Sequence, residues 1–69
     1  MNEDELNLSI RKFLKKVGIT SQREIENAIR SAIESGQLND DGSLEVSMTL
    51  KMDHLSPDIV IDGQIKLQP

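Results

Sequence analysis

The only histidine of the chain stands among carboxylates that could share a metal ion with it. Asp53 precedes His54 directly, and Asp58 follows four residues later. An imidazole and two carboxylates are ligand types that zinc and other transition metals accept. One local turn does not close a tetrahedral site, and the neighbouring sequence signals no further ligand. We therefore interpret His54 as a solvated turn residue and predict no metal site.

The remaining candidates for chemistry are weaker. The segment Asn39-Asp40-Asp41-Gly42 has the composition of a calcium loop, but the glutamate that completes this loop is missing from the required place. Turn formation accounts for these residues. Neither Ser21 nor Ser56 has a candidate base in a nucleophile arrangement, and the four glycines are too scattered for a phosphate loop. We predict a protein that is not an enzyme and needs no cofactor.

Basic side chains gather on one face of the first predicted helix, together with one leucine. At about 100° per residue they share the side opposite the apolar stripe. Such a face is able to bind an acidic protein, RNA or lipid, and its alternative interpretation is an ordinary solvated surface. The predicted partner-binding residues are Leu8, Arg11, Lys12, Lys15 and Lys16.

The spacing of apolar residues predicts that this face belongs to a helix over residues 3–17. Asn2 is a good N-cap residue, with Glu5 three positions later, and Gly18 is suited to end the helix. The apolar residues lie three or four positions apart and form one stripe. They are Leu6, Ile10, Phe13, Leu14 and Val17.

A second helix is predicted over residues 22–35. Ser21 and Glu24 match the capping box S-x-x-E, and Gly36 ends the segment. Its stripe consists of Ile25, Ala28, Ile29, Ala32 and Ile33. Two helices joined at Gly18 also allow a helix-turn-helix interpretation. The acidic net charge and the glutamates of the second helix count against it, so nucleic-acid binding is the less favoured alternative.

Apolar residues then recur at every second position, which predicts two strands, residues 43–53 and 59–67, joined by a turn at 54–58. The whole chain is expected to form a single α+β domain, residues 1–69, in the order ααββ. One face of the hairpin is apolar, and it is the predicted dimer interface. Its residues are Leu44, Val46, Met48, Leu50, Met52, Ile59, Ile61, Ile65 and Leu67.

Length and charge limit the possible classes of protein. The 69 residues include no cysteine, so no disulfide or thiolate metal site is available. Residues 1–36 carry six acids and six bases, whereas residues 37–69 carry six acids and two bases. The acidic second half repels nucleic acid and anionic lipid. The sequence shows neither a signal peptide nor an apolar run long enough to span a membrane. We expect a cytoplasmic protein without a membrane partner.

Essentially the whole chain resembles a small family of short, uncharacterised bacterial proteins, most densely over residues 1–36. The resemblance rests on Met1-Asn-Glu-Asp, on Ser9-Ile-Arg-Lys-Phe-Leu-Lys and on Val17-Gly-Ile-Thr-Ser-Gln-Arg-Glu-Ile-Glu26. The hairpin half is similar in pattern more than in identity. The resemblance implies no activity, catalytic residue or cofactor, and it implies a compact homodimeric α+β protein.

The hairpin predicts how the protein assembles. A two-stranded sheet is marginally stable, and its unpaired edges attract another strand. A two-fold homodimer would join two hairpins into a four-stranded sheet covered by four helices. We therefore predict a small homodimeric interaction or regulatory module, for which a further protein partner is possible. The alternative is a nucleic-acid-associated protein that uses the basic face of the first helix.

Overall fold

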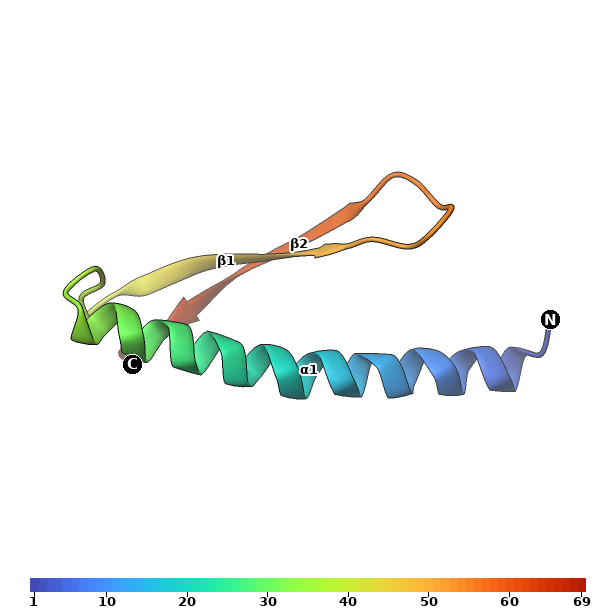
Figure 1. Ribbon diagram of the computed structural model, residues 1–69, viewed down its shortest axis with the longest axis horizontal. Helices are drawn as coiled ribbons and strands as arrows, with labels where there is room; N and C mark the ends of the chain where they lie inside the picture. The colour runs from blue at the N-terminus through green and yellow to red at the C-terminus, as the bar shows by residue number, and fades with distance from the viewer. The chain divides into compact units, whose positions relative to one another are not determined.

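The computed structural model describes residues 1–69 and contains one α-helix followed by a β-hairpin (Figure 1). The helix α1 is Glu3–Glu34, and the strands are β1, Ser43–Leu50, and β2, Ile59–Lys66. The predicted α+β class is confirmed. The chain divides into two compact units, Met1–Leu38 and Asn39–Pro69, and each is described below by itself.

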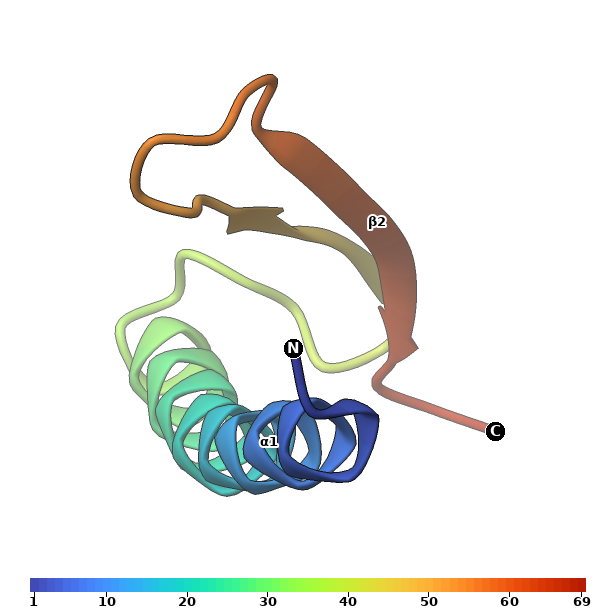
Figure 2. The same cartoon turned by 90° about the vertical axis from the view of Figure 1, so that its right-hand side faces the viewer.

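The prediction of two separate helices is wrong. The ribbon of α1 runs without a break through the predicted link between Gly18 and Ser21 (Figures 1 and 2). No proline interrupts this segment, and Gly36 is the only glycine with a positive φ. A glycine in a helix costs about 1 kcal/mol relative to alanine, which is too little to break a long helix. Ser21 therefore lies in the middle of α1 and caps nothing.

The two predicted apolar stripes merge because they are in phase. Leu6, Val17 and Ala28 follow one another at intervals of 11 residues, and the same interval joins Ile10 to Ser21. Eleven residues make three helical turns at about 3.67 residues per turn, so this spacing keeps side chains on one face. We call this face the α1 stripe. It consists of Leu6, Ile10, Phe13, Leu14, Val17, Ile25, Ala28, Ile29, Ala32 and Ile33.

Both predicted outer ends of the helical region are confirmed. Asn2 is the N-cap, and its side-chain oxygen accepts a hydrogen bond of 3.0 Å from the Glu5 amide. At the other end Gly36 has a φ of 81°. The Gly36 amide donates to the Ile33 carbonyl, and the Gln37 amide donates to the Ala32 carbonyl. These two bonds form a Schellman motif, which satisfies carbonyls that the helix itself leaves free.

The two glycines give opposite predictions for alanine substitution. Gly18→Ala should raise the free energy of unfolding by about 1 kcal/mol, since the position is helical. A Cβ there meets no atom within 4 Å. Gly36→Ala should lower it by about 1 kcal/mol or more, because alanine disfavours the left-handed conformation. Denaturant titrations followed by circular dichroism, at one protein concentration, measure both. Equal losses in the two variants would show that the helix ends at Gly18.

The hairpin unit has the predicted alternation of side chains. Its antiparallel register pairs Leu44 with Ile65 and Met48 with Ile61, so apolar residues of both strands share one face. Ser47 and Asp62 form a pair on the opposite face. Figure 1 shows the two strands as a twisted ribbon closed by a loop.

Both strands end earlier than predicted. β1 ends at Leu50 and β2 at Lys66, so Met52 and Leu67 lie outside the strands. The reason for the first difference is a turn: the Leu55 amide donates to the Met52 carbonyl, and His54 has a φ of 67°. A left-handed residue cannot continue a strand, so the chain already reverses before the predicted end. Pro57 lies outside the ladder, as expected.

No residue in either unit is buried. A single helix and a two-stranded ribbon each lack a second layer against which to pack their apolar side chains. The apolar faces of both units are therefore surfaces in this chain, and they are the first candidates for binding.

Candidate interaction surfaces

The α1 stripe is the longest apolar surface of the helical unit. Leu6, Phe13 and Leu14 are 39%, 55% and 56% exposed. The 11-residue spacing holds them on one side of a helix of 32 residues. The two halves of the stripe differ in bulk, because its N-terminal half carries only large residues. In its C-terminal half, Ala28 and Ala32 alternate with isoleucines.

The predicted partner-binding residues all lie on α1. Four of them lie on the side opposite the α1 stripe, and Arg11 lies at the edge of the stripe, in line with Ile33. We call the five residues the basic face: Leu8, Arg11, Lys12, Lys15 and Lys16. Residues 6–23 contain these four bases and Arg23 and no acid at all. Four bases separated by turns along a single helix produce a concentrated positive potential. That this face binds a partner stays a prediction.

Sequence reasoning missed one apolar residue of this region. Ile19 was expected to tuck under a turn between two helices, but no turn exists there, and its side chain is 54% exposed. It follows Leu8, which is 46% exposed, by 11 residues, so the two point to the same side of α1. The 11-residue interval, applied across Gly18, is the signal that would have placed it. Two apolar side chains thus stand among the bases.

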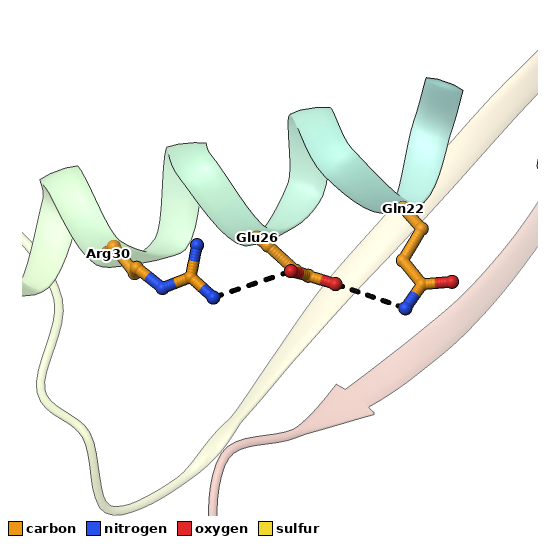
Figure 3. Close-up of polar contacts among 3 residues, drawn as sticks. All are labelled: Gln22, Glu26 and Arg30. Carbon is orange, nitrogen blue, oxygen red and sulfur yellow. Dashed lines mark hydrogen bonds and ion pairs between the residues drawn. The ribbon is translucent and has the colours of Figure 1, made fainter. Parts of the chain in front are cut away.

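Further along α1, one carboxylate joins two neighbouring polar side chains (Figure 3). Gln22 Nε2 donates to Glu26 Oε1 at 3.0 Å, and an Arg30 guanidinium nitrogen donates to Glu26 Oε2 at 3.3 Å. Exposed pairs of this spacing contribute about 0.3–0.5 kcal/mol each. Since α1 is continuous here, the helix-turn-helix interpretation of these residues is wrong.

The apolar face of the hairpin holds seven of the nine predicted dimer-interface residues within the ladder. Met48, Ile59 and Ile61 remain 42%, 49% and 61% exposed. Val46 faces Gly63, which has no side chain to fill the space. A hollow of about 760 Å³ is lined by Glu45, Val46, Ser47, Asp62, Gly63 and Gln64, and four of these six residues belong to the opposite, polar face. The hairpin therefore offers an open apolar face to which this hollow does not belong.

No three side chains of the histidine, cysteine, aspartate and glutamate types come together as metal ligands would. His54 lies in the hairpin loop in a left-handed conformation. α1, despite its length, is not apolar enough to cross a membrane.

Comparison with known proteins identifies a family and little else. The model of a family of unknown function, DUF6494, matches residues 1–68. This confirms the expected resemblance to an uncharacterised family over essentially the whole chain. No curated protein and no solved structure matches.

Proposed function

The chain belongs to the DUF6494 family of unknown function, and we propose that it is a non-enzymatic homodimer that serves as an interaction module. The observation that carries this proposal is the absence of a core: neither unit buries a single residue. An isolated two-stranded hairpin is marginally stable, and most of the stability of a helix comes from packing its apolar face. Both units therefore need a covering surface.

A second copy is the occupant that fits the α1 stripe best. The helix is about 48 Å long, at 1.5 Å for each of its 32 residues. Another α1 supplies an apolar stripe of the same length, and close packing of two such stripes is a common way to bury them. Most soluble oligomers are built in this way from identical chains related by a two-fold axis. The apolar face of the hairpin becomes covered within the same dimer.

The role as an interaction module rests on the basic face. A dimer that buries the α1 stripe leaves the opposite side of each helix accessible. There Leu8 and Ile19 stand among bases. This combination suits an acidic protein segment with apolar side chains of its own, because charge steers the encounter and apolar contacts add affinity.

Sedimentation equilibrium at micromolar concentration tests the proposal. The expected mass is twice the chain mass of 7.7 kDa. Cooperative unfolding should shift to higher denaturant concentration as protein concentration rises, because association stabilises the folded chain by mass action. A monomer that unfolds cooperatively, independently of concentration, would contradict the homodimer.

A second candidate function is nucleic-acid association, which the acid-free run of residues 6–23 favours. Phosphate contacts make binding fall with salt, with a logarithmic slope of about −0.9 per contact on duplex DNA. We expect no binding of a labelled duplex at physiological salt, since residues 37–69 carry a charge of −4 from six acids and two bases. Anisotropy titrations at two salt concentrations test this. Salt-sensitive binding that the double substitution Lys12→Glu/Lys15→Glu removes would favour the alternative.

A further inference from the structure

We infer that the two copies of α1 pair antiparallel, about a two-fold axis close to residue 19. This inference rests on the homodimer proposed above and adds the arrangement of its interface. Two independent features of α1 support it. One is the distribution of side-chain size along the α1 stripe, and the other is the distribution of charge along the helix.

Side-chain size differs between the two ends of the α1 stripe. The distance between two packed helices, about 8–10 Å, depends on the side chains at their contact. In a parallel pair Phe13 would meet Phe13, and Ala28 would meet Ala28. The helices would then be forced apart at one end and leave a gap, or lose contact, at the other. An antiparallel pair sets three large residues of the stripe against small ones, and Phe13 against Ile25, so the separation of the axes varies less along the pair.

Three pairs of positions along the helix fit this register. Leu6 and Ala32 lie equally far along the helix from residue 19, Leu6 before it and Ala32 after it. Ile10 and Ala28 form a second such pair. Residues at equal distances from the two-fold axis face each other in an antiparallel pair. Each of these two pairs matches a large aliphatic side chain with an alanine.

A third pair occupies the centre of the interface. Val17 and Ser21 lie two positions on either side of residue 19. Ser21 is the small polar residue of the 11-residue repeat, on the same side of α1 as the stripe. Its short side chain lets the helices approach closely where they cross.

Charge separates along α1 into blocks. The first turn holds three carboxylates, those of Glu3, Asp4 and Glu5, and no base. Residues 6–23 hold five bases and no acid. A parallel pair would set each block beside its own copy, and like charges placed side by side oppose association. In the antiparallel pair residues 11–16 run beside residues 22–27 of the second copy, which include Glu24 and Glu26 as well as Arg23. Three of the four bases of residues 11–16 point away from the α1 stripe, so this charge acts across the pair only at a distance.

In the antiparallel pair the two copies of Glu34 lie 30 positions apart along the helix direction, or about 45 Å. The hairpins then follow from opposite ends of the helix pair. In a parallel pair both helices end at the same place, which brings the two hairpins together and favours a four-stranded sheet. The two arrangements are therefore alternatives that one experiment separates.

Cysteine cross-linking tests the orientation, since the chain has no cysteine of its own. The variants Leu6→Cys and Ala32→Cys are prepared separately, with different affinity tags, and also mixed and refolded together before oxidation. We expect a disulfide-linked dimer only in the mixture, containing one chain of each kind. Within each single variant the introduced thiols lie about 39 Å apart, because they are 26 positions from each other along the helix. A disulfide needs Cα atoms within about 7 Å.

The outcomes distinguish the orientation from the dimer itself. A linked dimer in the Leu6→Cys sample alone would overturn the antiparallel pairing and leave the homodimer in place. If no disulfide-linked dimer forms in chains whose sedimentation mass is dimeric, the antiparallel pairing is likewise overturned and the homodimer stays in place. A monomeric mass for the unmodified chain would overturn the proposed homodimer. The Lys51→Cys variant, which lies outside α1, serves as the control for random oxidation.

Discussion

Replacing Leu14 with glutamate is expected to dissociate the homodimer and to lower the free energy of unfolding by about 2–4 kcal/mol. Leu14 lies in the large-residue half of the α1 stripe and is 56% exposed in the single chain. A carboxylate placed there would have to lose its water in the helix pair without gaining a partner. Sedimentation mass and a denaturant titration, measured on the same sample, give both effects.

Leu8→Glu is the matched control for this substitution. Leu8 is the same residue type in the same helix and is 46% exposed, but it belongs to the basic face. Its replacement should leave the mass dimeric and change stability by no more than about 0.5 kcal/mol. It should instead weaken the docking of an acidic partner. A dimeric Leu14→Glu variant, or a monomeric Leu8→Glu variant, would show that the interface lies elsewhere.

Replacing Met48 with aspartate is expected to disrupt the hairpin. Met48 pairs with Ile61 in the middle of the apolar face and is 42% exposed in the single chain. If this face is covered in the dimer, the new carboxylate is desolvated without a partner, which costs about 2–4 kcal/mol. Amide hydrogen exchange of β1 and β2 should become fast, while concentration-dependent unfolding shifts to lower denaturant.

Thr49→Asp provides the comparison on the other face of the same strand. Thr49 pairs with Val60, so the substitution leaves the apolar face unchanged. We expect Thr49→Asp to lower stability by only a fraction of the loss caused by Met48→Asp, because the added charge remains in water. Similar losses in both variants would mean that the apolar face stays open to solvent and that the hairpin takes no part in the dimer.

The pairing of the two strands was predictable from the sequence, but the residues at which the strands end were less so. Alternation of apolar and polar residues defines which side chains share a face, since the period of a strand is two. The pairs Leu44–Ile65 and Met48–Ile61 follow from it. The early end of β1 depends on a backbone choice at His54, whose φ is 67°. Histidine adopts that conformation more often than most residues do, but still in a small minority of cases, so its presence alone does not predict the turn.

The candidate surfaces were predicted only in part. The basic face needed nothing beyond the rotation of 100° per residue within one helix, and its residues do share one side of α1. The full α1 stripe and the exposure of Ile19 depend on the continuity of the helix. Neither surface is buried within its own unit, and association in solution must decide their use.

The sequence by itself determined the kinds of structure, the outer ends of the helical region and the faces of the hairpin. Periodicity and the capping chemistry of Asn2 and Gly36 are local properties that few other interactions oppose. Only the tertiary structure decided that Gly18 and Ser21 lie inside one helix. Each of their local preferences for a helix end is worth about 1 kcal/mol. Continuation instead keeps the backbone hydrogen bonds of the link, and that gain outweighs two weak signals to stop.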